Sequence, residues 1–189
     1  MRVIAGKYRS RPLRSLSGLD LRPTADRLRE TLFNVLTAGD PTVLEGTVWL
    51  DLYAGTGAVG IEAVSRGASM VYFAESSARA AELIKQNLTS LEITAGFQIL
   101  NQDSIRALRV LESGGAVADF VFLDPPYDLE DAYTQALFSL AKSPVLKPET
   151  IVMAEHPKRF DPGEQFASLH RYRKLLQGDA ALSFYRKEQ

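Results

Sequence analysis

The sequence of 189 residues contains no cysteine. This absence excludes disulfide bonds, thiolate metal sites and a cysteine nucleophile. The two histidines, His156 and His170, are too few for a histidine-rich metal cluster, so no bound metal is expected. No stretch approaches the roughly 20 apolar residues of a membrane-spanning helix, and the amino terminus lacks the apolar core of a secretory signal. We therefore expect a cytoplasmic protein without a membrane partner.

Length and composition predict a single globular domain with a short appendage. A chain of 189 residues can bury one core but leaves little room for a second. Apolar residues make up 46% and charged residues 24%, which argues against disordered and fibrous classes. We expect an appendage over residues 1–40 and the main domain over residues 41–189. Nothing such as a long apolar edge demands a dimer, so we expect a monomer.

The positive charge of the chain is concentrated near its amino terminus. The formal net charge is only −1, yet residues 1–36 hold eight Lys and Arg against three Asp and Glu, a net charge of +5. Such asymmetry is typical of a basic arm that binds a polyanion, although arginines also often form an ordinary solvated face. The cationic residues that we expect to bind RNA are Arg2, Lys7, Arg9, Arg11, Arg14, Arg22, Arg27 and Arg29.

Short apolar runs alternate with helical stretches after Thr47, which is typical of βαβ units. Before them, residues 1–16 alternate as in a small hairpin, and Thr24 can cap a helix that ends near Gly39. After them, Gly178 and Asp179 predict the turn of an antiparallel hairpin. The expected strands are 47–53, 70–75, 97–101, 119–123, 150–155, 168–176 and 180–186, and the expected crossover helices are 58–66, 77–91, 103–112 and 130–142. The prediction is an α/β, Rossmann-like fold with a mostly parallel, seven-stranded sheet.

A glycine-rich loop, Ala54-Gly55-Thr56-Gly57-Ala58-Val59-Gly60, joins the first predicted strand to a helix. Glycines there allow a sharp turn and let a ligand approach the backbone N–H groups at the helix amino end. The spacing also matches the dinucleotide fingerprint, because Glu75 follows about 20 residues later, where a ribose-binding acid belongs. An NAD-binding protein is therefore a genuine alternative.

Two further acids favour a different ligand at the glycine loop. Asp51 precedes the loop, where a negative charge suits the cationic amino group of a methionine moiety better than a pyrophosphate. Asp103 follows the third strand, where it can accept a hydrogen bond from an adenine amino group. It can equally cap the helix that begins there, and the loop can be a turn that binds nothing.

The sequence Asp124-Pro125-Pro126-Tyr127 follows an apolar strand, at the same sheet edge as the glycine loop. An exocyclic amino nitrogen of a nucleobase is a weak nucleophile, since its lone pair is delocalised into the ring. The Asp124 carboxylate and the Pro125 carbonyl can draw off its two hydrogens and aim the lone pair at a methyl donor. Tyr127 offers a ring for base stacking. In the alternative, the loop has only a structural role: the prolines interrupt the regular secondary structure and Asp124 caps the next helix.

The order of these motifs resembles class I S-adenosylmethionine-dependent methyltransferases that act on amino groups. The resemblance implies the class I methyltransferase fold, S-adenosylmethionine as cofactor and S-adenosylhomocysteine as product. It assigns the methionine end to the glycine loop, the ribose to Glu75, the adenine to Asp103, and the target base to Asp124-Pro125-Pro126-Tyr127. The full set implied for the cofactor is Asp51, Tyr53, Ala54, Gly55, Thr56, Gly57, Gly60, Glu75, Ser76, Asp103 and Ser104.

The amino-terminal segment narrows the resemblance. Residues 6–13 (GKYRSRPL) and 22–34 (RPTADRLRETLFN) are similar to the signature of bacterial 16S rRNA guanine-N2 methyltransferases, the small-subunit methyltransferase D family. Ala25 departs from it, since that family often has threonine there. The resemblance implies 16S rRNA, in the small ribosomal subunit or an assembly intermediate, as partner. Methylation of adenine N6 in DNA or RNA remains an alternative, because the Asp-Pro-Pro-Tyr loop suits that amine too.

Overall fold

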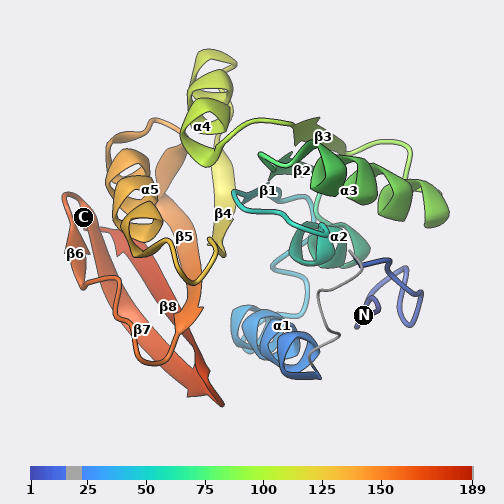
Figure 1. Ribbon diagram of the computed structural model, residues 1–189, viewed down its shortest axis with the longest axis horizontal. Coiled ribbons are helices and arrows are strands. Elements are labelled where there is room, and N and C mark those ends of the chain that lie inside the picture. The colour runs from blue at the N-terminus through green and yellow to red at the C-terminus, as the bar shows by residue number, and fades with distance from the viewer. Residues whose placement is uncertain (16–22, 189) are drawn as a thin grey trace.

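The protein is built on one eight-stranded sheet in the order β3-β2-β1-β4-β5-β8-β7-β6 (Figure 1). The structure is a computed structural model and describes residues 1–15 and 23–188. Its strands are β1 (Val48–Asp51), β2 (Met70–Ala74), β3 (Phe97–Leu100), β4 (Ala118–Leu123), β5 (Leu146–Pro157), β6 (Gln165–Phe166), β7 (Leu169–Gln177) and β8 (Ala180–Lys187). Its helices are α1 (Pro23–Leu36), α2 (Ala58–Ser65), α3 (Ala78–Ser90), α4 (Ser104–Ser113) and α5 (Glu130–Lys142).

The predicted α/β class is confirmed, with five parallel strands followed by antiparallel ones. The sheet has eight strands where seven were expected, because β6 adds two residues beside β7, too few to leave a sequence pattern. Strand β5 is also longer than the predicted 150–155. Its pairing with β4 shifts between Ala118 and Phe120, because residues 147–150 form a bulge in which Thr150 donates to the Ala118 carbonyl.

The predicted amino-terminal hairpin is reduced to an isolated antiparallel bridge between Arg2 and Pro12. Val3 still exchanges backbone hydrogen bonds with Ser10 and Arg11. Two features stop the pairing there: Pro12 has no N–H to donate, and Ser10 has a φ of 66°, outside the extended region. The side chain of Thr24, the predicted helix cap, lies outside the described residues, as does Arg22.

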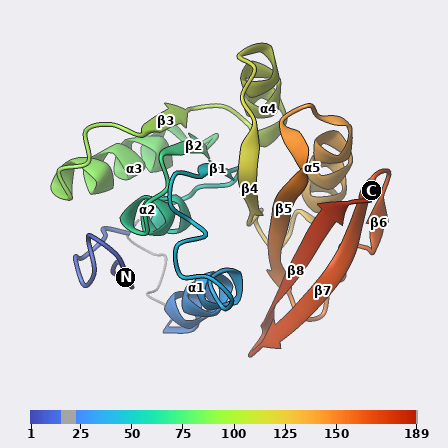
Figure 2. The same ribbon diagram turned by 180° about the vertical axis from the view of Figure 1, so that it is seen from behind.

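Helices cover both faces of the sheet, and alternate residues of each strand serve different cores (Figures 1 and 2). One core joins Trp49 and Phe120 to α2, α3 and the amino-terminal segment, whereas the other joins Leu50 and Val121 to α4 and α5. Helix α1 is attached through stacked rings, with Trp49 lying between Phe33 at 5.3 Å and Phe120 at 4.8 Å. The described residues among 1–40 therefore pack into the core of the main domain.

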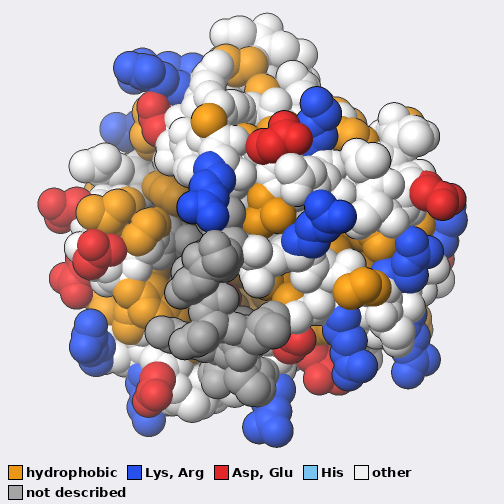
Figure 3. All heavy atoms as spheres, turned by 45° about the vertical axis from the view of Figure 1, so that its right-hand side comes forward, with side chains coloured by type: hydrophobic (Ala, Val, Ile, Leu, Met, Phe, Trp, Pro, Cys, Tyr) orange, Lys and Arg blue, Asp and Glu red, His pale blue; other side chains and the backbone are white. Residues whose placement is uncertain are grey.

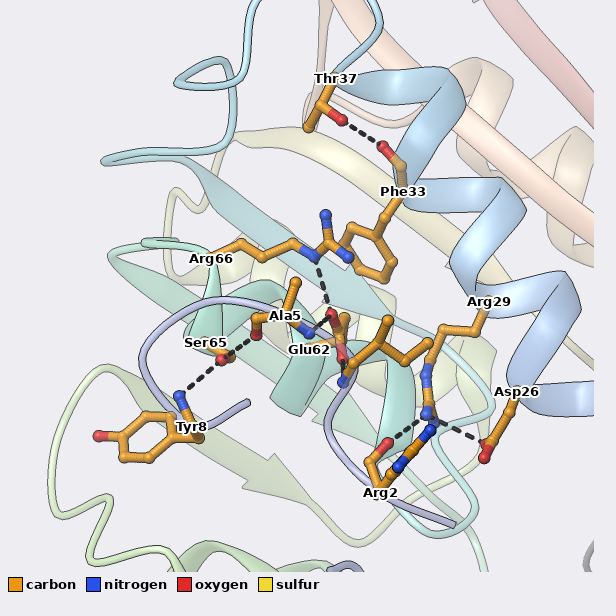
Figure 4. A network of polar contacts seen from close by, with 11 residues as sticks. Arg2, Ala5, Tyr8, Asp26, Arg29, Phe33, Thr37, Glu62, Ser65 and Arg66 are labelled. Carbon is orange, nitrogen blue, oxygen red and sulfur yellow. Dashed lines mark hydrogen bonds and ion pairs between the residues drawn. The ribbon is translucent and has the colours of Figure 1, made fainter. Parts of the chain in front are cut away.

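A buried carboxylate holds the amino-terminal segment against α2 (Figure 4). Glu62 is 0% exposed and accepts hydrogen bonds from the backbone N–H groups of Ile4 at 2.8 Å and Ala5 at 2.9 Å. Arg66 forms an ion pair with the same carboxylate, with its Nε 2.8 Å from Glu62 Oε1. Charge-assisted bonds of this kind are strong where water is excluded, so the segment has a fixed position on the body.

The described part of the chain contains no helix that is both long and apolar enough to span a membrane. Within residues 1–15 and 23–188, no three His, Cys, Asp or Glu side chains gather in a way that would hold a metal ion.

Candidate active site

The glycine loop forms an open cradle after β1. Gly55 and Gly57 have φ values of 54° and 78°, a backbone conformation that residues other than glycine rarely adopt. A Cβ atom on Gly55 would meet nothing within 4 Å, so the backbone there faces open space. A hydrogen bond within the loop stabilises this turn, because the Gly57 N–H donates to the Ala54 carbonyl at 2.7 Å. A ligand can approach this backbone closely.

Asp51 is a buried acid beneath the cradle, at the end of β1. It is 2% exposed and accepts a hydrogen bond from the Gly60 N–H at 3.2 Å. Burial raises the pKa of Asp51 to about 7, and repulsion from Glu75 adds to the rise while the Gly60 bond opposes it. A cation placed beside this carboxylate would relieve the cost of its charge. The site thus suits the ammonium group of a methionine moiety.

Glu75, at the end of β2, is held by two backbone donors. Its Oε2 accepts from the Gly55 N–H and its Oε1 from the Ser77 N–H, both at 2.8 Å. Asn101 holds the backbone next to it by donating to the Glu75 carbonyl at 2.8 Å. Because each carboxylate oxygen can accept more than one bond, Glu75 keeps capacity for a pair of ribose hydroxyls. Asn101 was not among the predicted residues.

A cavity of about 320 Å³ lies beside Glu75. Its lining includes five residues predicted for the cofactor: Tyr53, Glu75, Ser76, Asp103 and Ser104. Leu129 and Gln135 close it on the side of the Asp-Pro-Pro-Tyr loop. The structure therefore brings together residues that are more than 50 positions apart in the sequence.

Asp103 caps a helix and also lines this cavity. It caps α4 by accepting from the Arg106 N–H at 2.9 Å, and it forms an ion pair with the Arg106 side chain at 3.3 Å. It also lines the cavity, next to Ser104, whose hydroxyl is 2.8 Å from that of Tyr53. Capping and adenine binding are compatible, since a carboxylate accepts several hydrogen bonds.

Asp124 follows β4 directly and is partly buried. It does not cap α5, since the residue at that position is Leu129 and no side chain caps the helix. Burial, followed by repulsion from Glu155 and Asp51, raises the pKa of Asp124 well above its ordinary value. Strands β1 and β4 are parallel neighbours with Asp51 opposite Phe122, so Asp51 and Asp124 lie at the same carboxyl edge of the sheet.

Tyr127, Tyr133 and Glu155 support this loop, and of these three only Tyr127 was predicted from the sequence. Tyr127 donates to Glu155 Oε1 at 3.3 Å, and Tyr133 donates to the Glu155 carbonyl at 2.9 Å. The Tyr133 hydroxyl is also 3.4 Å from the Pro125 carbonyl, a long contact that leaves this acceptor available. Burial raises the pKa of Glu155 to about 7, while the Tyr127 bond opposes the rise. The position of Glu155 at the end of a buried parallel strand was the available signal.

The basic residues of the amino-terminal segment differ in exposure. Those on the surface are Arg2, Lys7, Arg9, Arg11, Arg14 and Arg27. Arg29 instead is 6% exposed and donates to the Arg2 carbonyl at 2.5 Å and to Asp26 at 3.2 Å (Figure 4). Figure 3 shows Lys and Arg side chains spread over one face with apolar and acidic groups between them.

Asn87 links the basic segment to the glycine loop. Its side chain accepts from the Arg14 N–H at 2.8 Å and donates to the Arg14 carbonyl at 3.2 Å. The same amide nitrogen donates to the Thr56 carbonyl at 3.0 Å. Asn87 is 0% exposed, so these bonds are made out of contact with water. One buried side chain therefore connects the basic segment to the glycine loop.

A family model described as "Conserved hypothetical protein 95" matches residues 1–186 of the chain. The chain is 33% identical over 188 residues to "Putative rRNA methyltransferase YlbH" of Bacillus subtilis, covering 99% of both. It is 37% identical over 159 residues to "Ribosomal RNA small subunit methyltransferase D" of Haemophilus influenzae, covering 84% of this chain and 79% of that one.

Solved structures resemble the whole chain as well. "Putative methyltransferase yhhF from Escherichia coli" superposes with a TM-score of 0.78 at 28% identity, covering 100% of this chain and 98% of that one. The methylase HI0767 from Haemophilus influenzae gives a TM-score of 0.77 at 29% identity, covering 100% and 99%. The predicted class I methyltransferase fold and the predicted relationship are thus confirmed.

Proposed function

The chain belongs to the family described as conserved hypothetical protein 95, and from this membership we propose that it methylates the N2 amine of a guanine in 16S rRNA. The names of its relatives, which are ribosomal RNA methyltransferases, support the general activity in this proposal: S-adenosylmethionine-dependent methylation of ribosomal RNA. One observation carries the proposal: β1 and β4 are paired in parallel with Asp51 opposite Phe122, so Asp51 and the loop that begins at Asp124 lie at the same edge of the sheet.

The donor set at this edge fits S-adenosylmethionine. Asp51 lies where it can meet the ammonium group, Glu75 retains acceptor capacity for the ribose, and the 320 Å³ cavity can receive the adenine. The open space over Gly55 lets the methionine end lie against the backbone. When bound, this cofactor supplies an electrophilic methyl group attached to a sulfonium. A pyrophosphate would be repelled by Asp51, which disfavours the NAD alternative.

Asp124 and the Pro125 carbonyl orient the target amine. A guanine N2 nitrogen has two hydrogens, and two fixed acceptors can hold both while the lone pair turns toward the methyl group. The prolines fix φ at two consecutive positions, and Tyr133 holds the chain beyond them, so the acceptors need no reorganisation during the reaction. When nitrogen has gained the methyl group it must lose one proton, and Asp124 is the adjacent base.

The target base must leave its stack to reach this loop. Tyr127 is 37% exposed and offers a ring face on which the extruded base can stack. Stacking of this kind contributes roughly 1–3 kcal/mol per base in single-strand recognition. A loop or another unpaired region of RNA costs least to unstack. The exposed arginines of the amino-terminal segment would hold the neighbouring phosphates, and we leave the buried Arg29 out of that surface.

Replacing Asp124 tests this proposal. Asp124→Ala should abolish methyl transfer to small ribosomal subunits while calorimetry shows S-adenosylmethionine binding within a few-fold of the wild type. Asp128→Ala, an exposed acid in the same loop, is the matched control and should retain activity. Full activity of the Asp124→Ala protein would refute the proposed role. We further propose that the enzyme acts as a monomer, which sedimentation of the active protein can check.

A further inference from the structure

Glu155 lies beside Asp124 on the neighbouring strand β5, two residues before that strand ends. Leu123 of β4 is paired with Ala154 of β5, so Asp124 and Glu155 follow two aligned residues of parallel strands. Side chains at aligned positions point to the same face of a sheet. The coulombic effect of Glu155 on Asp124 agrees with this placement. Two carboxylates therefore face the same region.

The position of Glu155 is fixed at both its side chain and its backbone. Tyr127, the proposed stacking residue, donates to Oε1, and Tyr133 donates to the backbone carbonyl. An ionised carboxylate has two oxygens and about four acceptor positions, so a single bond from Tyr127 leaves most of its capacity unused. A base stacked on Tyr127 would therefore have its edge close to a second strong acceptor.

The edges of guanine and adenine differ in the group next to the amine. Guanine has a donor, N1–H, beside its N2 amine, whereas adenine has an acceptor, N1, beside its N6 amine. We propose that Glu155 accepts the N1–H of the target guanine and thereby selects guanine over adenine; this inference rests on the proposed function. Where Glu155 is ionised, above its pKa of about 7, adenine would place its N1 lone pair against the carboxylate, and such a mismatch is an effective way to reject a competing ligand.

The choice of a carboxylate at this position supports a role beyond holding Tyr127. Glutamine at residue 155 would accept the Tyr127 hydrogen bond without any charge to desolvate. The burial that raises the pKa of Glu155 to about 7 is thus a cost that the support of Tyr127 does not require. A donor on the substrate offsets that cost.

The test compares two bases that present the same N2 amine. Small subunits are reconstituted with 16S rRNA that carries either guanine or 2-aminopurine at the nucleotide that the wild-type enzyme methylates, located beforehand by mass spectrometry. In 2-aminopurine the N1 atom is an acceptor. The wild type should prefer guanine by about 10- to 100-fold in kcat/KM, the range expected for one discriminating contact. The wild type and the variant are measured on the same two substrates. The change in preference between them therefore does not depend on how reactive the two amines are.

Glu155→Gln should reduce this preference to about threefold or less, because an amide can offer N1 either an acceptor or a donor. Glu149→Gln, the same change at an exposed residue of the same strand, should keep the wild-type preference. An unchanged preference in Glu155→Gln would overturn the inference. So would a wild type that methylates both bases equally, whatever the variant does. Absence of any guanine-N2 product from the wild type would instead refute the proposed function.

Discussion

Gly60 lies directly against the ring of Phe73, so that a Cβ atom on Gly60 would be 2.2 Å from Phe73 Cε1. Phe73 belongs to β2 and Gly60 to the first turn of α2, and their contact lets the helix lie close to the sheet. The Gly60 N–H is also the donor to Asp51. Helix packing and the geometry of the glycine loop therefore depend on the same residue.

Gly60→Ala should lower the free energy of unfolding by about 1–3 kcal/mol, the usual cost of overpacking a core. It should also weaken S-adenosylmethionine binding, because the shifted helix moves the donor away from Asp51. Urea denaturation and calorimetry measure the two effects. Gly39→Ala is the control and should be nearly neutral, since a Cβ there meets nothing within 4 Å. A Gly60→Ala protein as stable as this control would contradict the packing argument.

Asp51 should make the cofactor-free protein less stable as the pH rises. Its pKa is about 7 in the folded protein, against about 3.9 in an unfolded chain, so the folded state binds more protons between these values. The free energy of unfolding therefore falls as pH increases from 5 toward 7, by at most about 1.4 kcal/mol per pH unit for this group.

Asp51→Asn removes that titration. The stability of the variant relative to the wild type should grow between about pH 5 and 8, as measured by denaturant unfolding without cofactor. Taking the difference cancels titrating groups that do not interact with Asp51, such as His156, whose pKa burial lowers. A difference that stays constant with pH would show that Asp51 is not held at a raised pKa.

The basic segment should contribute counterion release on RNA binding. Replacing Arg9 and Arg11 with glutamine should weaken the complex with small-subunit RNA and reduce the slope of log K against log salt by roughly one to two. Arg109→Gln with Lys142→Gln removes the same charge from α4 and α5, at exposed residues outside the segment, and should leave the slope unchanged. Equal slopes for the wild type and the Arg9/Arg11 variant would show that these two arginines do not contact RNA phosphates.

Local patterns were sufficient to predict most of the fold and to bring the two loops of the candidate site to one edge of the sheet. The glycine loop and the Asp-Pro-Pro-Tyr loop are each contiguous in the chain, and parallel topology alone brings their strand ends to one edge. Tyr133 and Asn87 could not be assigned in this way, and Glu155 was missed although it is the last residue of the predicted strand 150–155. Each acts through a partner at least eight residues away, as in the contact of Tyr127 with Glu155, which spans 28 residues.

Arg29 shows how composition alone can mislead. It was counted with the exposed cations, yet it lies on the same helix face as Leu32, Phe33 and Leu36, at the spacing of a buried stripe. The periodicity therefore contained the signal that composition obscured. Its guanidinium is satisfied in part by the Arg2 carbonyl, a contact that depends on where the first residues fold.

The most direct test of the whole account is the identity of the methylated nucleoside. Small ribosomal subunits that lack the modification are incubated with the enzyme and labelled S-adenosylmethionine, and their 16S rRNA is digested for mass spectrometry. The account predicts labelled N2-methylguanosine with the wild type and none with Asp124→Ala. Labelled N6-methyladenosine in its place would contradict it.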